Sequence, residues 1–318
     1  MDDTDRKLML LICANPRIRL RELAKSLGIS TQAVHHRIQV LTEIGVIEGM
    51  TTGISIHYLH AVPLIIFGKS TTTSVKETLD RLGESEFSSL ALVAGGNYLY
   101  VIGLLRDISE LDGYTEFVKR VGKMPEPTVG IFGLDYPEYR LTTDGGKRNR
   151  SYKELSPLDL KIIASLKDDA RRTIEDIASD VGVSTKTVRR HLDDMISEGS
   201  LEFYVPWDPV AGENTLLMVH VNLRDDTDKV GIGRRLLSKY PLQIVFIRTF
   251  RNIPGFLWCV LSMEKPTEIR RILREISEDK DVLTVVPNFV YLERNYPTWR
   301  DKLPEIRMRP PEKAKRAA

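Results

Sequence analysis

Residues 20–41 read LRELAKSLGISTQAVHHRIQVL, and this stretch is the starting point for interpreting the whole chain. Its first apolar side chains recur at the spacing of one helix face. They are Leu20, Leu23, Ala24 and Leu27. Gly28 follows, where a helix end favours a left-handed residue that glycine adopts at little cost. Ser30 can then cap a second helix by accepting a hydrogen bond from its first turn. The stretch therefore predicts a helix, a tight turn and a second helix.

The second helix separates an apolar stripe from a polar face. Val34, Ile38 and Leu41 continue the apolar spacing. The polar side chains left over are Thr31, Gln32, His35, His36 and Gln39. Two short helices of which the second presents a polar, basic face are typical of a helix-turn-helix. Taken alone, the pattern also fits two packed core helices of an ordinary α-domain.

The pattern returns later in the chain at a constant offset of 154 residues. Gly28 is matched by Gly182 and Ser30 by Ser184. The apolar stripe is conserved in character but not in identity, because one apolar residue replaces another at equivalent positions. Leu27, for example, is matched by Val181. Because the stripe, the turn glycine and the cap serine recur together, we interpret the chain as an internal duplication.

Composition is that of an ordinary globular protein. The chain has 318 residues, which is enough for two to four domains, with 42% hydrophobic and 28% charged residues. Cys13 and Cys259 form no CxxC motif, so a disulfide framework or a zinc site is not expected, and a cytoplasmic location fits. No apolar run approaches the roughly 18 residues that span a bilayer. The acidic N-terminus lacks the basic start of a signal peptide.

The net charge of +2 does not by itself indicate nucleic acid, but positive charge gathers in two segments. Residues 140–154 carry five basic and two acidic side chains, and residues 296–318 carry seven basic and three acidic ones. These segments are either basic arms that bind nucleic acid or soluble spacers.

Each helix-turn-helix is followed by a series of strand and helix patterns. Residues 3–14 predict a helix before the first motif, and residues 46–49 predict a short strand and wing after it. Residues 61–133 then read strand, helix, strand, strand, helix, strand, with a tight turn at residues 94–97 between the middle strands. The same order returns over residues 215–292. This order is the ferredoxin-like unit.

The predicted fold class is therefore α+β, with two winged helix-turn-helix domains each followed by a ferredoxin-like βαββαβ domain. The expected domains are a winged helix-turn-helix at 1–56, a ferredoxin-like domain at 57–136, a linker at 137–154, a second winged helix-turn-helix at 155–210, a second ferredoxin-like domain at 211–295 and a loosely held basic tail at 296–318.

These residues resemble the leucine-responsive (Lrp/AsnC) family of regulators. The first half carries Asp5, Glu22-Leu23-Ala24, Leu27-Gly28-Ile29-Ser30, Val34, Arg37-Ile38 and Gly45-Val46-Ile47 of its motif. The second half keeps Asp159, Ile177-Ala178, Val181-Gly182-Val183-Ser184 and Val188, but has His191 where arginine is expected. Family members usually carry one copy, so a fused pair departs from the pattern.

The resemblance implies a prokaryotic transcription regulator that binds double-stranded DNA. It also implies that the βαββαβ domains associate and that they sense a small molecule. A flexible linker of about 18 residues raises the effective concentration of one such domain for the other, so we expect the two to pair within one chain, and association of two chains is left open. The family's sensing turn is rich in glycine and carries an acidic residue. This chain has Gly95, Gly96 and Asn97 there, with Asn in place of Asp, and the second half keeps little of the turn. No cofactor, metal or membrane is expected.

Candidate DNA contacts lie on the polar faces of the two second helices. Those of the first are Thr31, Gln32, His35, His36 and Arg37, and those of the second are Thr185, Lys186, Thr187, Arg189, Arg190 and His191. Lysine and arginine neutralise phosphates, and glutamine and arginine can also read base edges in the major groove. The alternative is a solvated, charged helix face without DNA.

Two other functions compete with DNA binding. The sirohaem decarboxylases, a branch similar to this family, use the same arrangement to process a tetrapyrrole, for which they need His and Tyr near the middle strands. In this chain the middle strands of the second half carry no histidine. The side chains there are Phe246, Arg248, Phe250, Arg251 and Trp258. The other alternative is a protein-interaction module that has lost DNA binding.

Overall fold

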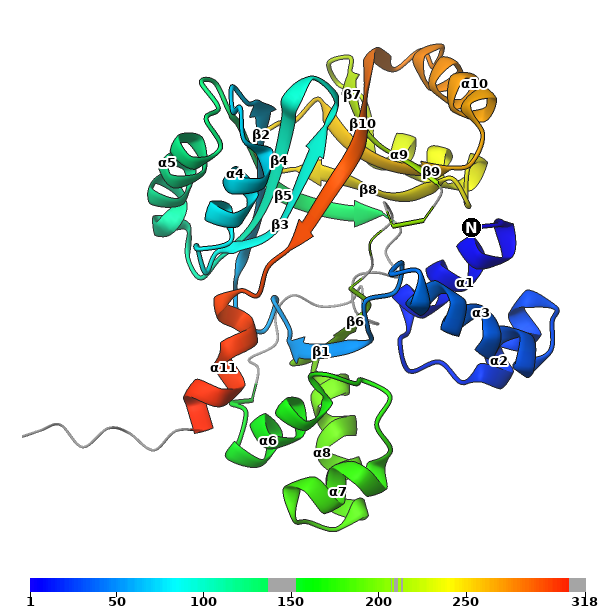
Figure 1. Ribbon diagram of the computed structural model, residues 1–318, viewed down its shortest axis with the longest axis vertical. Helices are drawn as coiled ribbons and strands as arrows, with labels where there is room; N and C mark the ends of the chain where they lie inside the picture. The colour runs from blue at the N-terminus through cyan, green and yellow to red at the C-terminus, as the bar shows by residue number, and fades with distance from the viewer. Residues whose placement is uncertain (137–152, 207, 209–210, 213, 309–318) are drawn as a thin grey trace, which may run out of the picture.

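The computed structural model describes residues 1–136, 153–206, 208, 211–212 and 214–308. Figure 1 shows its two levels, a β-barrel wrapped by helices above and two small helical domains below. Most of the predicted linker, residues 137–152, lies outside the described residues.

Both small domains are winged helix-turn-helix units. The first consists of α1 (Asp3–Ala14), α2 (Leu20–Leu27), α3 (Thr31–Glu43) and β1 (Thr51–Ile54). The second consists of α6 (Pro157–Leu166), α7 (Ile174–Val181), α8 (Thr185–Glu198) and β6 (Leu201–Tyr204). The predicted wing strand at residues 46–49 is displaced, because only Ile47 forms an isolated β-bridge there and the wing strand β1 begins at Thr51. Val46 and Ile47 are buried in the core of the domain.

Local chemistry accounts for both tight turns. Gly28 and Gly182 end α2 and α7 in the left-handed conformation, with φ of 69° and 76°. The hydroxyl of Ser30 accepts from the N–H of Ala33, and that of Ser184 accepts from the N–H of Thr187, each at 3.1 Å. These are the helix end and the cap that the sequence pattern predicts.

The two βαββαβ domains together build one closed barrel. The first contributes β2 (Val62–Lys69), α4 (Val75–Leu82), β3 (Ser88–Ala94), β4 (Tyr98–Leu105), α5 (Leu111–Val121) and β5 (Thr128–Tyr136), with short 3₁₀ turns η1 (Gly95–Asn97) and η2 (Ile108–Glu110). The second contributes β7 (Thr215–Leu223), α9 (Lys229–Lys239), β8 (Ile244–Phe250), β9 (Phe256–Met263), α10 (Pro266–Ser277) and β10 (Val282–Asn295). The predicted fold class is confirmed.

The strand order around the barrel is β10-β3-β4-β2-β5-β8-β9-β7. The halves join at two equivalent seams, where the last strand of each half pairs with the second strand of the other. An aromatic core fills the barrel, and separate cores lie between each half-barrel and its own pair of helices. The two domains therefore pack on each other within the chain.

The winged helices are also joined across the duplication. Strand β1 pairs antiparallel with β6, so the two wings form one small sheet. Ile54, at the end of β1, is fully buried in the core of the second winged helix, and Val205 packs into the core of the first. Each half therefore completes the hydrophobic core of the other.

The predicted loosely held tail at 296–318 is wrong for its first part. Residues Trp299–Met308 form α11, which packs against α6 and β1. Trp299 is buried, and its indole N–H donates to the carbonyl of Leu104 at 2.8 Å. Figure 1 shows α11 descending from the end of β10 beside the second winged helix. The helix thus ties the first half-barrel to the second winged helix.

Candidate nucleic-acid interface

The predicted contact face of α3 is exposed at its N-terminal end. Thr31, Gln32, His35 and His36 are all exposed. Arg37 behaves differently, because its guanidinium turns back to α1 and lies 2.6 Å from Asp5 and 2.9 Å from Asp2. These pairs raise the pKa of Arg37 further and keep its charge within the domain. Arg37 therefore fastens α3 to α1.

On α8 the exposed side chains are the more basic ones. Lys186, Arg189 and Arg190 are exposed, as is Thr185. Thr187 is half-buried, and its hydroxyl lies 2.9 Å from that of the capping Ser184. His191 turns toward α6, where its Nδ1 lies 2.7 Å from Oδ1 of Asp159. The two helices thus have equivalent arrangements, but the second exposes Lys186, Arg189 and Arg190 where the first exposes a glutamine and two histidines.

Two equivalent arginines hold the winged helices against each other. Arg17 donates to the carbonyls of Ala170 and Arg172. Arg171, its equivalent at the offset of 154, donates to the carbonyls of Pro16 at 2.8 Å and Ile18 at 3.2 Å. The contact is reciprocal, as in a two-fold dimer. These two arginines were not among the residues predicted from the sequence, although the sequence places them at equivalent positions of the duplication.

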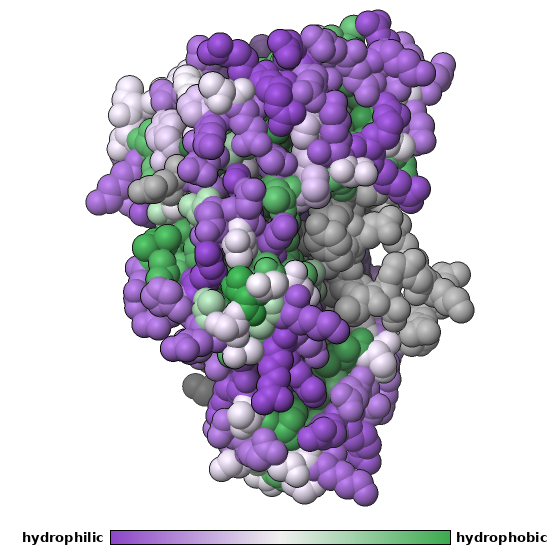
Figure 2. Space-filling model, turned by 90° about the vertical axis from the view of Figure 1, so that its right-hand side faces the viewer, coloured by the Kyte–Doolittle hydropathy of each residue, from purple (hydrophilic) through white to green (hydrophobic). Residues whose placement is uncertain are grey.

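Together these contacts fix the relative positions of α3 and α8. The shared wing sheet, the exchanged core residues and the arginine pair all act between the two winged helices. A pocket of about 360 Å³ lies between them, lined by α3 and by Arg171. Figure 2 views the molecule from the side of the first winged helix, and that face is mainly hydrophilic with scattered apolar patches.

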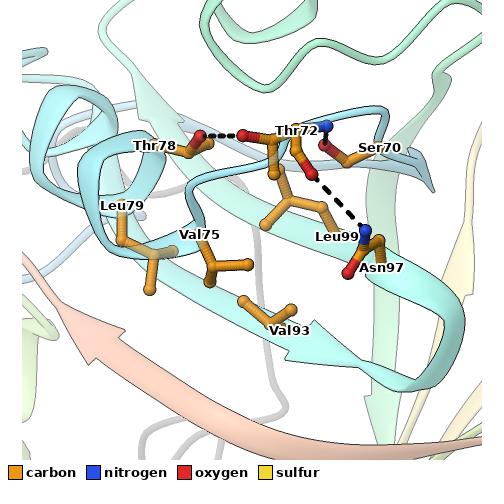
Figure 3. A pocket seen from close by; sticks show the side chains of 8 residues that line it. All are labelled: Ser70, Thr72, Val75, Thr78, Leu79, Val93, Asn97 and Leu99. Atoms are coloured by element: carbon orange, nitrogen blue, oxygen red, sulfur yellow. Dashed lines mark hydrogen bonds between the residues drawn. The ribbon is translucent and has the colours of Figure 1, made fainter.

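The predicted effector turn is η1. Gly96 and Asn97 both have positive φ, and the Asn97 amide donates to the carbonyl of Thr72 at 3.4 Å. Figure 3 shows Asn97 at the rim of a small cavity beside α4, with Thr72 and Thr78 joined on its far side. The cavity holds about 10 Å³, room for a single water. Gly95 and Gly96 are not among its lining residues. Effector binding at this turn stays a prediction.

The barrel interior places a histidine beside the middle strands of the second half, although β8 and β9 themselves carry none. His220 on β7 reaches across the barrel to Tyr100 on β4, with 2.8 Å between Nε2 and the phenol oxygen. Burial lowers the pKa of His220 to about 4, so the ring is neutral. Both side chains are buried, and Tyr100 stacks on Trp258 at 6.1 Å and on Phe67 at 5.9 Å between ring centroids. The space around this pair is filled by aromatic side chains.

Among the described residues, no three His, Cys, Asp or Glu side chains are grouped so that they could hold a metal ion. In the same part of the chain, no helix is both long and apolar enough to cross a bilayer.

Comparison with known proteins finds a matching family of DNA-binding domains and several similar regulators. The family described as winged helix-turn-helix DNA-binding matches residues 1–48 and 155–201. The HTH-type transcriptional regulator Ptr1 of Methanocaldococcus jannaschii is 34% identical over 113 residues, which are 35% of this chain and 76% of that protein. The regulator LrpA of Pyrococcus horikoshii is 32% identical over 113 residues, which are 35% of this chain and 80% of LrpA.

A solved structure shares the fused arrangement over most of the chain. The siroheme decarboxylase NirDL superposes with a TM-score of 0.61 over 95% of this chain and 96% of its own. The two sequences are 14% identical, so the likeness concerns the fold alone.

Proposed function

This chain belongs to the Lrp/AsnC family of winged helix-turn-helix transcription regulators, and we propose that a single chain engages double-stranded DNA with both recognition helices, α3 and α8. The observation that carries this proposal is the reciprocal bridging by Arg17 and Arg171, which sets the two helices in a fixed relation. The exposed recognition residues would supply the contacts, and these are Thr31, Gln32, His35, His36, Thr185, Lys186, Arg189 and Arg190.

We expect the bound site to be asymmetric. In a homodimer two identical helices read a palindrome, whereas here α3 offers Gln32, His35 and His36 where α8 offers Lys186, Arg189 and Arg190. Selection of binding sites from random duplexes, followed by footprinting and measurement of the number of chains bound, tests this. We expect one chain on two half-sites of different sequence. A palindrome bound by one chain would contradict the proposal.

The second recognition helix should supply most of the salt-dependent affinity. Replacing Arg189 and Arg190 together by Ala should flatten the slope of log K against log salt by up to about two units, because each phosphate contact contributes about 0.9. Titrations at several salt concentrations and pH 8 measure the slope. The matched variant with His35 and His36 replaced by Ala should change it little, because histidine is mostly neutral at that pH. An unchanged slope in the arginine variant would remove both arginines from the interface.

The proposal also includes small-molecule sensing, and the candidate binding site is the η1 turn of Gly95, Gly96 and Asn97. Because the neighbouring cavity admits only a water, an effector there would have to open α4 from the turn or bind outside the cavity.

We do not propose tetrapyrrole processing, although the fold is shared with NirDL. The buried Tyr100–His220 pair is a feature that favours it, but Tyr100 is packed against the rings of Phe67 and Trp258 in the barrel interior. Adding sirohaem and recording the absorbance near the Soret band separates the two functions. A stoichiometric spectral change would favour the enzyme.

A further inference from the structure

The two recognition helices carry the same pair of side-chain types in exchanged order. Helix α3 reads His36-Arg37, and at the offset of 154 residues helix α8 reads Arg190-His191. In both helices the second member of the pair turns back to an aspartate on the first helix of its domain, Asp5 or Asp159. The residue that faces outward is therefore a histidine in α3 and an arginine in α8.

The two anchoring pairs have different chemistry. Arg37 is charged at every relevant pH, so its pairing with Asp5 does not titrate. His191 and Asp159 lie 2.7 Å apart, and their side chains are 21% and 12% exposed. Histidine is the side chain whose charge changes near neutral pH. The second recognition helix is thus fastened by a titratable contact where the first is not.

The hydrogen bonds of His191 decide which ring nitrogen carries the proton. Burial acts to raise the pKa of Asp159, but hydrogen bonds from Ser156 and His191 outweigh it and hold that pKa below its usual value. An ionised carboxylate only accepts, so Nδ1 of His191 must donate to it. In the neutral ring Nε2 is then an acceptor, and Nη2 of Arg190 lies 3.4 Å from it. An arginine only donates, so this contact fits the neutral ring.

Protonation of the ring removes the contact between Nε2 of His191 and Arg190. A charged imidazole donates from both nitrogens, so the guanidinium of Arg190 would lose its acceptor and face a like charge. The charged groups that the structure sets against the ring are Asp159, from α6, and Arg190, from α8 itself.

We propose that His191 is a positioning residue, whose neutral ring, oriented by Asp159, holds the guanidinium of Arg190 in place for reading DNA and releases it on protonation. This inference rests on the proposed DNA binding of α8. Selectivity at the second half-site should therefore fall as the pH falls from about 8 to about 5.5.

The variant His191→Arg separates positioning from a merely structural role. Arginine can pair with Asp159 as Arg37 pairs with Asp5, so the helix stays fastened, but Arg190 loses its acceptor. At pH 8 we expect its discrimination between the selected second half-site and single-base variants to drop roughly tenfold, the effect of one lost base contact. This drop should occur although the variant adds a positive charge.

Three comparisons complete the binding experiment. Wild-type protein at pH 5.5 should discriminate as poorly as His191→Arg does at pH 8. Arg190→Ala should lose the same selectivity and also its pH dependence. Arg37→His, the mirror change in the first helix, should leave discrimination at the second half-site unchanged. Wild-type selectivity retained by His191→Arg would overturn the proposal.

A measurement without DNA keeps this proposal distinct from the proposed function. In full-length protein labelled with ¹⁵N-histidine, we expect the His191 proton on Nδ1 at pH 8, and side-chain signals of Arg190 that shift with the same midpoint as the His191 ring. A proton on Nε2, or Arg190 signals that ignore the titration, would overturn it. Absence of DNA binding by every variant would overturn the proposed function instead, and the ring-nitrogen spectrum would still decide whether His191 holds Arg190.

Discussion

Replacing Arg300 by Ala should lower the free energy of unfolding by about 3–5 kcal/mol, the usual cost of leaving one partner of a buried ion pair alone. Arg300 lies in the first turn of α11, and its Nη1 is 2.7 Å from Oε1 of Glu202 on β6. The two side chains are only 11% and 16% exposed. The guanidinium also lies over the Tyr204 ring, 5.0 Å from its centroid.

The wing sheet is shaped to receive this arginine. A Cβ atom at Gly53, on β1, would overlap the guanidinium, so no larger residue fits there without movement of Arg300. Asp301 accepts from the hydroxyl of Tyr204 at 3.3 Å and from the backbone N–H of Thr298 at 2.7 Å. The start of α11 is thereby fixed against strands from both halves of the chain.

Urea unfolding followed by circular dichroism and by tryptophan fluorescence measures the effect of Arg300→Ala. The double variant Arg300→Met with Glu202→Gln is the control, because it removes both charges and keeps the packing, and we expect it to recover much of the loss. A midpoint for Arg300→Ala equal to that of the wild type would show that the Arg300–Glu202 pair does not stabilise the folded chain.

The elements that could be predicted from the sequence are those set by local patterns. Gly28 and Ser30 define a turn and a cap within a few residues, and their recurrence at Gly182 and Ser184 revealed the duplication. The βαββαβ order followed in the same way from short apolar runs and turn signals. Because such patterns involve neighbours along the chain, they are visible before folding.

The elements that were predicted wrongly depend on partners far along the chain. Strand β1 has only four residues and contains Gly53, and it is completed by β6, which pairs with it about 150 residues later. Helix α11 contains Pro304 and many charges, which suggested a loose tail, and it is held by contacts with Leu104 and Glu202. No local pattern reports such contacts.

The candidate site shows the same division. The exposed cations of α8 followed from helical spacing, whereas the inward turn of Arg37 and His191 did not. One signal was available, because Asp5 precedes Arg37 by 32 residues and Asp159 precedes His191 by the same separation. A charge pair repeated in both copies of a duplication indicates a contact, and it would have marked both residues as fastening the recognition helices.

The free energy of unfolding should also depend strongly on pH, through Glu293. It lies near the end of β10, where the barrel meets the first winged helix, and it shares the amide of Asn295 with Glu48, at 3.5 Å and 3.3 Å. Burial, together with the nearby charges of Asp208 and Glu48, raises the pKa of Glu293 to about 8. The folded state therefore favours the protonated carboxyl.

The sign of the effect follows from linkage. A carboxyl whose pKa is higher in the folded than in the unfolded chain contributes stability that is fully present below about pH 4 and is lost as the pH rises through about 8. Wild-type stability should thus fall between about pH 5 and pH 9. Glu293→Gln cannot ionise, so we expect it to be more stable than the wild type at pH 9, by up to about 5 kcal/mol.

Urea midpoints at pH 5, 7 and 9 test this expectation. Glu77→Gln, at an exposed position on α4, is the matched control and should run parallel to the wild type. If Glu293→Gln also ran parallel, the carboxyl would be ionised in the folded chain throughout this range. If instead the two curves separate steadily between pH 5 and about pH 8 and then run parallel, ionised Glu293 adds a third negative charge beside Glu48 and Asp208. Because Glu48 immediately follows the buried Val46 and Ile47, that repulsion would act directly on the attachment of the first winged helix to the barrel.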